Sequence, residues 1–487
     1  MPERDPTGLM IVAPSTVAAG EEFSLGIKVL CDPWYVPAAA FFGLLPKLLS
    51  RFNHSPRGIH YMDNAATRWD GALEVEGPSG PSRIPLSELP GVFEGDTRAI
   101  GRVEGFSFSE PGVYTVRLMD GAHGLMGESN AVVVSEEPPA ERLWWGDLHS
   151  QTFFSDGLRC PEELYHFARH ESFLDIFAMA DHSEALTDRQ WDYFCAVTND
   201  SYAPDEFATL IGFEWTNHWP GHRNCYYPGD SGPIVRHGER SVEDLQRLYD
   251  VAAEHGALLI PHHPANVTMG VEWEAAHDPE HERLVEIHSV WGNSERPAEA
   301  GNPLPILSSK GEQAGRHVID ALDMGYRLGF VGGGDIHDGR PGDELHSLQH
   351  PEPQHYDLLR RQGIMGVWAA ELTREAIFDA LWERNCFATT NVRMPIRFSV
   401  CGARQGAMAQ CNDERPVSVW AASEAPIARV TIVRGGEDWK TLVPHECVVD
   451  WQVEDAASGA AEYYYARVER EDGRMGWSSP VWVNSDE

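Results

Sequence analysis

Alternation of apolar and polar positions dominates the first part of the chain. Runs such as FSLGIKVL, from Phe23, and GVYTVRLM, from Gly112, are strand-like, and Gly, Pro or Asp turns separate such runs. A period of two residues is that of strands with one buried face. The pattern therefore predicts an N-terminal β-sandwich-like domain over residues 1–138, and the acidic, proline-containing SEEPPAER is expected to link it to the rest of the chain.

From residue 142 to about residue 395, apolar runs of strand length alternate with stretches of helical period. In SVEDLQRLYDVAAEHGALLIPHHP, Ser241 is expected to cap a helix that ends at Gly256, and ALLI begins a buried strand. The expected buried face of this helix contains Leu245, Leu248, Tyr249 and Ala252. GRHVIDALDMGYRLGFVGGGDIH repeats the design, with Val318, Ala321 and Leu322 on the helix face. This alternation predicts an α/β domain over residues 142–395.

After residue 395 strand-like runs return, among them PIRFSV, ARVTIVRGG and EYYYARVER. A second β-rich, sandwich-like domain is therefore expected over residues 396–487. A chain of 487 residues with 42% hydrophobic residues has the length and the apolar content for two or three domains. The sequence shows no short-period repeat, which disfavours solenoids and propellers.

The formal net charge of −37 restricts the partners that the chain can bind. No basic patch is visible, so nucleic acid binding is not expected. The expected partner is a small-molecule substrate, and an anionic substrate is compatible with this charge where metal ions supply local positive charge. Nothing in the sequence defines an oligomeric state.

Cysteine usage and apolar stretches bear on the location of the protein. The eight cysteines form no CxxC pair, which is typical of reduced thiols, and MPERDPTGLMIV does not resemble a signal peptide. WYVPAAAFFGLLPKLLSRF, from Trp34, is interrupted by Pro37 and Pro46 and is too short to span a bilayer. We interpret it as a packed loop or short helix, with a flap that touches a membrane or covers a substrate as the alternative. A cytoplasmic protein with no membrane partner is expected.

Six successive apolar runs of the middle region stop at residues that commonly bind metal ions. In WWGDLHSQ, the side chains of Asp147, His149 and Gln151 project to one face of the predicted strand. The later runs stop at Asp181 and His182, Glu214, His262 and His263, His288, and Asp335 and His337. One such residue is more often a helix cap than a ligand, but six in order favour convergence at the C-terminal face of a parallel barrel.

The chemical types of these residues indicate which ions would bind. Imidazoles and carboxylates without thiols suit Mn²⁺, Zn²⁺ or Fe²⁺. Their number exceeds what one ion can use, so two to three divalent transition-metal ions are expected.

The order of these motifs resembles that of a known superfamily. GDLHSQTFFSDG, ADHSE, GFEWT followed by GHRN, PHHP and GGGDIHDGRPG occur in the order and spacing of the PHP (polymerase and histidinol phosphatase) superfamily of metal-dependent phosphoesterases. With LTREAIFDALWERNCFATT and the β-rich flanks, the chain is similar to a large β-decorated branch catalogued as a domain of unknown function. The resemblance implies a distorted TIM-like (β/α)7 PHP barrel, with up to three metal ions, flanked by N- and C-terminal β-rich domains.

The resemblance also implies which side chains hold which ion. The first ion would be held by His149, the Gln151 position, Glu214 and Asp335. The second would be held by Glu214, His222 and His263, and the third by Asp156, His182 and His337. Glu214 would bridge two ions, and His262 is the alternative to His263.

Gln151 departs from the superfamily's commonest motif, in which a second histidine stands at this position. A carboxamide oxygen is a weaker, neutral ligand. Gln151 would therefore either bind the first ion loosely or only hold a bound water molecule.

Further residues are expected near the substrate or behind the ligands. This set contains Asp147, Asp181, His262, Glu286 and His288. A structural hydrogen bond is equally open for Glu286 and His288. Arg223 and Arg340 lie beside ligands in the sequence, and a guanidinium can bind two phosphate oxygens. A local salt bridge is the alternative for both arginines.

The leading hypothesis is a metal-dependent phosphoesterase that acts on a phosphomonoester or phosphodiester. A hydroxide bridging two ions would attack phosphorus, with Glu214 and Asp335 holding the ions and an arginine neutralising developing charge. His182 or His337 would protonate the leaving group if the third ion is absent. The alternatives are a metal-dependent hydrolase of a carboxylic ester, amide or lactone, and a non-catalytic saccharide- or ligand-binding protein that uses its β-domains and sixteen tryptophans.

Overall fold

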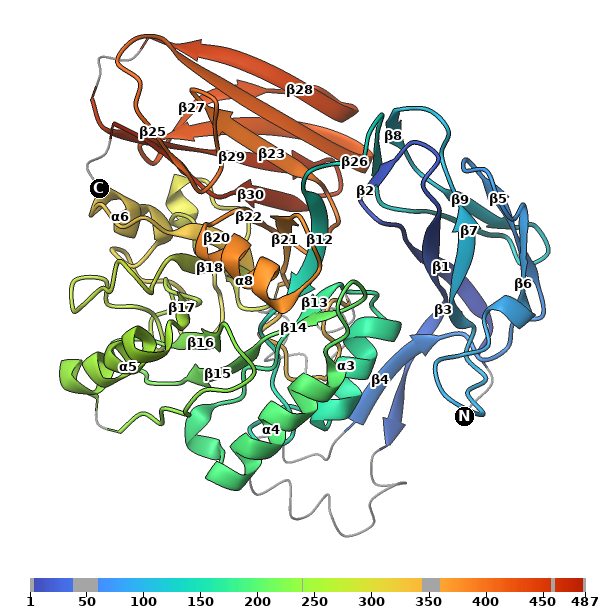
Figure 1. Cartoon of the computed structure of the whole chain (residues 1–487), viewed down its shortest axis with the longest axis horizontal. Helices are drawn as coiled ribbons and strands as arrows, with labels where there is room; N and C mark the ends of the chain where they lie inside the picture. The colour runs from blue at the N-terminus through green and yellow to red at the C-terminus, as the bar shows by residue number, and fades with distance from the viewer. Residues whose placement is uncertain (1–3, 38–59, 239, 344–359, 457–459, 485–487) are drawn as a thin grey trace.

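The computed structural model describes residues 4–37, 60–238, 240–343, 360–456 and 460–484. These residues form 31 β-strands and five α-helices, so the protein is a mixed α/β structure in which strands dominate (Figure 1). Most of the apolar stretch after Trp34 lies outside the described residues. In the described part of the chain, no helix combines the length and the apolar character needed to cross a membrane.

The N-terminal strands form three sheets at one side of the molecule (Figure 1). The first sheet contains β1 (Pro6–Val12), β3 (Phe23–Pro37), β4 (His60–Ala65) and β7 (Ile100–Phe106). The second contains β5 (Ala72–Glu76), β6 (Arg83–Pro85), β9 (Arg117–Asp120) and β10 (Leu125–Glu128). The third contains β2 (Thr16–Ala18), β8 (Gly112–Tyr114) and β11 (Val132–Ser135), and one 3-10 turn, η1 (Leu86–Glu88), follows β6.

Strand β3 is buried on both faces. Leu25, Ile27 and Val29 alternate along it and are fully buried in the N-terminal core, as their period of two predicts. The opposite face packs on the middle region, because a Cβ at Gly26 would lie 2.5 Å from the ring of Phe173. The N-terminal sheets are therefore attached to the part of the chain that carries the metal-ligand residues.

The middle region alternates strands and helices. Its strands are β12 (Arg142–Asp147), β13 (Ile176–Phe177), β14 (Ala208–Thr209), β15 (Ile211–Trp215), β16 (Arg223–Tyr227), β17 (Leu258–Pro261), β18 (Leu284–Ser289), β19 (Gly292–Asn293), β20 (Gly329–Gly332), β21 (Ile364–Ala369) and β22 (Cys386–Thr389). Its helices are α3 (Pro161–His170), α4 (Asp188–Ser201), α5 (Val242–His255), α6 (Val318–Asp323) and α8 (Arg374–Trp382), with 3-10 turns η2 (Ser183–Ala185) and η3 (Ala298–Ala300).

Helix α5 confirms the expectation from local sequence. The Ser241 side chain accepts a hydrogen bond from the Asp244 amide at 3.2 Å, and Gly256 ends the helix with a φ of 64°. The buried face contains the four predicted apolar residues, and β17 follows at once. Helix α6 likewise buries its three predicted residues ahead of β20.

The strand directions in the middle region depart from a regular parallel barrel. Strands β12, β13 and β14 are parallel, as are β18 and β20, but β16 is antiparallel to both β15 and β17. Isolated parallel β-bridges connect these separate sheets. They pair His182 with Glu214, His262 with Glu286 and Ser150 with Ile336. The predicted (β/α)7 barrel is thus not confirmed. Only a loop separates β15 from β16, and a direct connection of this kind requires antiparallel pairing.

The C-terminal strands extend the sheet of the middle region. They are β23 (Ile396–Val400), β24 (Ala403–Arg404), β25 (Met408–Ala409), β26 (Arg415–Arg434), β27 (Glu437–Leu442), β28 (Glu446–Asp455), β29 (Glu462–Arg470), β30 (Met475–Ser478) and β31 (Val481–Val483). Strand β22 pairs with β21 on one side and with β30 on the other. Strand β22, before residue 395, and strand β30, after it, are hydrogen-bonded in one sheet. The domain boundary at residue 395 therefore stays a prediction.

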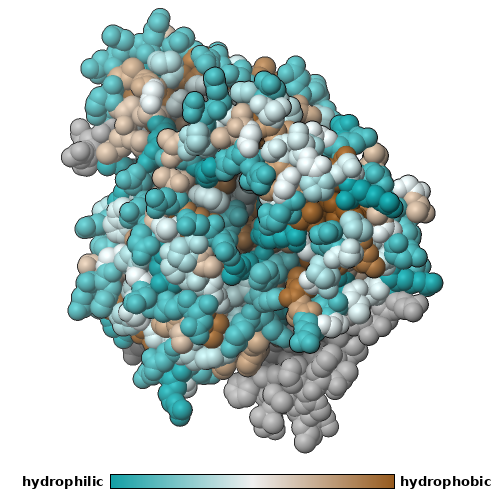
Figure 2. Space-filling view, turned by 45° about the vertical axis from the view of Figure 1, so that its right-hand side comes forward, coloured by the Kyte–Doolittle hydropathy of each residue, from teal (hydrophilic) through white to brown (hydrophobic). Residues whose placement is uncertain are grey.

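The surface agrees with the acidic composition. Hydrophilic residues predominate on the face shown in Figure 2, and apolar residues form smaller patches among them. This distribution is what a chain with a formal net charge of −37 is expected to present to solvent.

Candidate metal centre

Histidine and carboxylate side chains from the ends of the middle strands converge in one cluster. They form three groups, and within each group the ligand atoms lie within 4.8 Å of one another. Group one contains His149, His262, Glu286 and Asp335; group two contains His222, His262 and His263; group three contains Asp156, His182 and His337. Because His262 belongs to two groups, groups one and two are adjacent.

Glu214, near the end of β15, lies between the three groups. Its Oε1 is 2.9 Å from His222 Nδ1 and 3.4 Å from His262 Nε2. Its Oε2 is 3.5 Å from His149 Nε2 and 3.7 Å from His182 Nε2. The side chain is only 2% exposed. One buried carboxylate therefore contacts imidazoles from all three groups, which is the geometry that a bridging ligand requires.

Group one includes a glutamate that sequence reasoning placed behind the ligands. His149 Nδ1 is 2.9 Å from Glu286 Oε2, and His149 Nε2 is 3.4 Å from Asp335 Oδ1. The signal for Glu286 was available in the sequence: it is a carboxylate inside LVEIHS, a strand that is buried at every position. A charge in such a strand needs a partner or an ion.

Gln151 joins two carboxylates of the cluster. Its Nε2 donates to Glu214 Oε2 at 3.1 Å and to Asp335 Oδ1 at 3.4 Å. Its Oε1 is buried and has no hydrogen-bond partner among the described residues. A half-turn of the amide would present this oxygen to an ion held between the two carboxylates.

Group two depends on a turn of the backbone at His263. Neighbouring residues of an extended strand point to opposite faces, yet the rings of His262 and His263 lie 4.2 Å apart. The chain leaves the extended conformation at His263, whose φ is 34°. His263 also lies 4.9 Å from the ring of His222. The turn therefore brings both histidines to the cluster, and which of them binds an ion stays a prediction.

Group three is the most exposed of the three groups. Asp156 Oδ1 is 3.4 Å from His182 Nε2, and Asp156 Oδ2 is 3.3 Å from His337 Nε2. Its three side chains are between 20% and 30% exposed, whereas those of groups one and two are at most 4% exposed. A small molecule from solvent would therefore reach group three first.

Asp147 and Asp181 hold the backbone that carries the ligands. Asp147 Oδ1 accepts hydrogen bonds from the amides of His149 and Gly334 at 2.9 and 2.8 Å. Asp181 accepts from the amide and hydroxyl of Thr152. Burial raises the pKa of Asp147 to about 7 and that of Asp181 to about 6. Both carboxylates are thus used by the loops that position the cluster.

The glycines before Asp335 allow the chain to approach these carboxylates. A Cβ at Gly333 would lie 2.0 Å from Glu286 Oε2, and a Cβ at Gly334 would lie 2.5 Å from Asp147 Oδ2. Glycine leaves this space open, so the backbone can bring Asp335 close to the other members of group one.

Arg223 and Arg340 each form a salt bridge with a carboxylate outside the three ligand groups. Arg223 Nε donates to Glu282 Oε1 at 2.7 Å, because Arg223 points to the opposite face of the chain from its neighbour His222. Arg340 donates to Asp343 Oδ2 at 2.6 Å. The local salt bridge, which was the alternative for each arginine, describes both.

His288 is also engaged away from the ligand groups. Its Nε2 lies 2.9 Å from the carbonyl oxygen of Arg361, and its ring stacks on Trp477 with centroids 5.8 Å apart. Burial lowers the pKa of His288 to about 4. This neutral, packed histidine corresponds to the structural alternative left open for it.

The charges of the cluster shift its pKa values. Burial alone would raise the pKa of Glu214, but His182 and His262 hold it well below its usual range. Burial would lower the pKa of His337, but the Asp156 carboxylate raises it to about 9. Without cations, the carboxylates therefore favour a protonated ring at His337, whereas burial lowers the pKa of His222 to about 4 and favours a neutral ring there.

The donor atoms of the cluster fit divalent ions. Buried polar atoms without a hydrogen-bond partner are rare in folded proteins, yet several gather here among the described residues. They include His149 Nε2, Asp156 Oδ1, Glu214 Oε1, both ring nitrogens of His222 and His262, His263 Nδ1 and Glu286 Oε1. His222 Nδ1 and Glu214 Oε1 are 2.9 Å apart, but their angles do not make a hydrogen bond. Imidazole and carboxylate donors of this kind suit Mn²⁺, Zn²⁺ or Fe²⁺.

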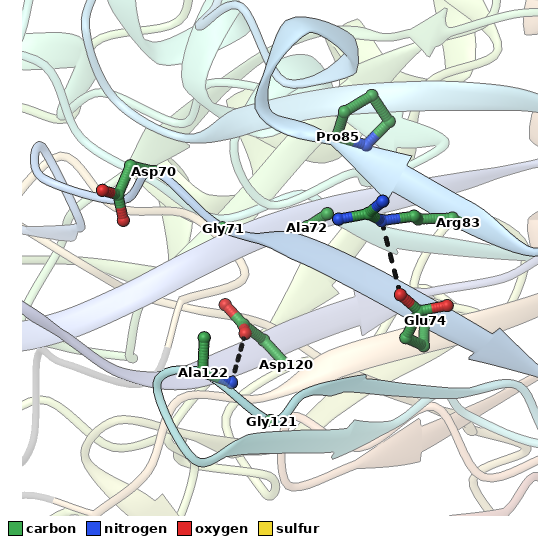
Figure 3. A pocket seen from close by; sticks show the side chains of 9 residues that line it. All are labelled: Asp70, Gly71, Ala72, Glu74, Arg83, Pro85, Asp120, Gly121 and Ala122. Carbon is green, nitrogen blue, oxygen red and sulfur yellow. Dashed lines mark hydrogen bonds and ion pairs between the residues drawn. The ribbon is translucent and has the colours of Figure 1, made fainter.

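A separate pocket of about 600 Å³ opens on the N-terminal strands β5, β6 and β9. In its lining, an ion pair of 3.3 Å joins Arg83 and Glu74 of neighbouring strands, and both side chains are more than half exposed (Figure 3). The pocket shares no residue with the three ligand groups. We therefore place the candidate chemistry in the cluster alone.

The fold and the cluster together describe a strand-rich α/β protein with candidate divalent-metal sites. A family described as "Protein of unknown function (DUF3604)" matches residues 162–299 and 322–431, which is more than half of the chain. The chain belongs to this family.

Relatives and solved structures give further similarities. The chain is 29% identical over 399 residues to an uncharacterized protein of Chlamydia pneumoniae and 28% identical over 401 residues to one of Chlamydia muridarum. Each alignment covers 77% of this chain but only 63% of the relative, so the chain spans less than two thirds of these proteins. A solved two-domain protein of Bacteroides vulgatus, described as containing a predicted PHP-like metal-dependent phosphoesterase, is 15% identical with a TM-score of 0.37, over 70% of this chain and 96% of that one.

Variants at Gln151 are expected to change metal binding in opposite directions. Gln151→His should keep or tighten binding at group one, because imidazole is a stronger ligand than a carboxamide. Gln151→Ala should weaken binding there first and leave group three filled. Titration of both variants with metal ions, monitored by calorimetry, measures these affinities. Unchanged affinity in both would mean that Gln151 only holds Glu214 and Asp335 in place.

Metal binding at group three is expected to strengthen as the pH rises. The pKa of His337 is raised to about 9, so at neutral pH its ring carries a proton that an ion must displace. The apparent affinity should rise by roughly tenfold per pH unit for each displaced proton until the pH passes this pKa. Titrations with Mn²⁺ at several pH values, with proton release recorded in weakly buffered solution, measure the effect. A pH-independent affinity would contradict the prediction.

Proposed function

We propose that the protein is a metal-dependent hydrolase of phosphate esters, with two to three divalent ions held by the three ligand groups. The observation that carries this proposal is the position of Glu214, whose carboxylate contacts histidines of all three groups. The motif order that resembles the PHP superfamily supports phosphorus as the atom attacked.

The proposal extends to the fold of the middle region. The strand pairs and parallel bridges can be followed from β12 through β13, β15, β16, β17, β18 and β20 and back to the segment after β12. We interpret this order as a distorted PHP-type barrel in which β16 is an antiparallel member. The ligand groups then lie at the rim where most of its strands end.

The side chains of the cluster have separate tasks in such a reaction. Divalent ions, when bound, activate water as a nucleophile at neutral pH and neutralise charge that develops on the phosphoryl oxygens. Glu214, Asp335 and Glu286 supply the negative charge that holds the ions, and Glu286 also orients the ring of His149. His182 and His337 are partly exposed and would pass a proton to the leaving group if group three holds no ion.

A hydrolase of a carboxylic ester or lactone is the second candidate. The two arginines expected to bind a phosphate are held by Glu282 and Asp343 instead. Neither guanidinium is therefore free to bind a phosphate oxygen without giving up its carboxylate partner. An uncharged ester would need no such group, because a metal-activated water also attacks carbonyl carbon.

One metal-loaded preparation tested on two substrate panels separates these candidates. We expect turnover of 4-nitrophenyl phosphate or bis(4-nitrophenyl) phosphate that is lost on chelation and restored by Mn²⁺ or Zn²⁺. Turnover of 4-nitrophenyl acetate or a simple lactone alone would favour the second candidate. A preparation that hydrolyses phosphate esters while elemental analysis finds no metal would refute the proposal.

A further inference from the structure

Trp291 is an aromatic residue at the candidate metal centre to which the proposed function assigns no task. It lies in the turn between β18 and β19. Its ring centroid is 6.3 Å from that of His263 in group two and 6.4 Å from that of His337 in group three, and the ring planes meet at 75° and 86°. The indole therefore borders two of the three ligand groups at once.

The indole nitrogen of Trp291 is buried without an acceptor. Among the described residues, Nε1 has no hydrogen-bond partner, although the side chain as a whole is only partly buried. Buried tryptophan N–H groups usually find an acceptor, and the N–H can only donate. An acceptor from outside the chain would satisfy it.

The turn that carries Trp291 is tied to the metal centre. The amide of Val290 donates to the carbonyl of Gly334 at 3.2 Å, next to Asp335. Gly292 has a φ of 132°, and a Cβ there would lie 3.0 Å from the backbone of Ile306. The turn is thus held on both sides, which fixes the indole relative to groups two and three.

We infer that Trp291 is a substrate-binding residue whose indole N–H donates a hydrogen bond to an oxygen of a phosphate ester lying against groups two and three. This rests on the proposed function. The ring adds an apolar wall beside that oxygen. An N–H donor carries no charge, so it orients the acceptor oxygen without adding to the cationic charge that ions provide.

The test compares inorganic phosphate binding in three variants of the metal-loaded full chain. Trp291→Phe removes the N–H and keeps an aromatic ring, Trp291→His keeps a ring N–H, and Trp439→Phe in β27 is the matched control. We expect Trp291→Phe to weaken phosphate binding by roughly tenfold in calorimetry, with metal content unchanged. Trp291→His should recover part of the affinity, and Trp439→Phe should match the wild type. For 4-nitrophenyl phosphate, KM should rise more than kcat falls.

Each result decides the inference. Phosphate affinity in Trp291→Phe equal to that of the wild type overturns it, and wild-type hydrolysis of phosphate esters would then leave the proposed function standing. Loss of metal from Trp291→Phe also overturns it, because the indole would then only support the histidines. A wild-type protein that neither binds phosphate nor hydrolyses its esters overturns both the inference and the proposed function.

Discussion

Replacing Glu214 with glutamine is expected to remove more than one ion from the protein and to lower hydrolysis by at least about 100-fold. The substitution keeps the size of the side chain and removes its charge. The carboxylate contacts four imidazoles, which come from all three ligand groups. Its loss therefore weakens several sites together, whereas the loss of an ordinary ligand weakens one.

Elemental analysis and activity of the same sample measure this effect, and two other variants calibrate it. Glu286→Gln should weaken group one and leave group three filled, because Glu286 contacts His149 and no ligand of group three. Glu243→Gln, on the exposed first turn of α5, should behave as the wild type. A Glu214→Gln protein with its full metal content at ordinary metal concentrations would show that Glu214 is not a bridging ligand.

The elements that local sequence controls were predicted well. Helix α5 begins at a serine cap, ends at a glycine with positive φ and buries a stripe of apolar residues, and each of these signals lies within the helix itself. Helix α6 also buries the three apolar residues predicted for its face and is followed by the predicted strand. The alternation in β3 correctly predicted a strand, but not that residues 25–29 would be buried on both faces.

Arrangements that depend on distant partners were not predicted. The antiparallel direction of β16 follows from a loop between Trp215 and Arg223 that has no simple hairpin signature in the sequence. Glu286 joins His149 across 137 residues of chain, so only its placement in a buried strand hinted at its position. His263 reaches the cluster because the backbone turns there, with a φ of 34°, and no residue pattern in the sequence predicts this turn.

Arg223 illustrates the same limit for charged residues. Sequence proximity to His222 suggested a phosphate contact, but the two side chains leave the strand in opposite directions. The partner that binds Arg223 is Glu282, which is 59 positions away. Tyr249 and His277 also contact Glu282, at 3.0 and 2.9 Å. The residues of this buried network are far apart in the sequence and meet only in the folded protein, so sequence motifs do not predict it.

The Arg223 and Glu282 pair provides the second large expected effect. Both side chains are fully buried and 2.7 Å apart. Removing one charge leaves the other buried without its counterion, so Arg223→Met or Glu282→Met is each expected to lower the free energy of unfolding by about 3–5 kcal/mol. The double variant should lower the free energy of unfolding by clearly less than the sum of the two single effects, because it leaves no unpaired charge buried.

Urea unfolding of the two single variants and the double variant, followed by circular dichroism, measures these differences. Hydrolysis by the folded fraction separates a structural role from a substrate contact. If Arg223 acts only through Glu282, the Glu282→Met and Arg223→Met proteins should lose stability alike and keep similar KM values for a phosphate ester. A stable Arg223→Met protein with a much higher KM would show that Arg223 binds the substrate. The structure predicts the first result, since the guanidinium points to Glu282 and to the carbonyls of Pro220 and Gly221.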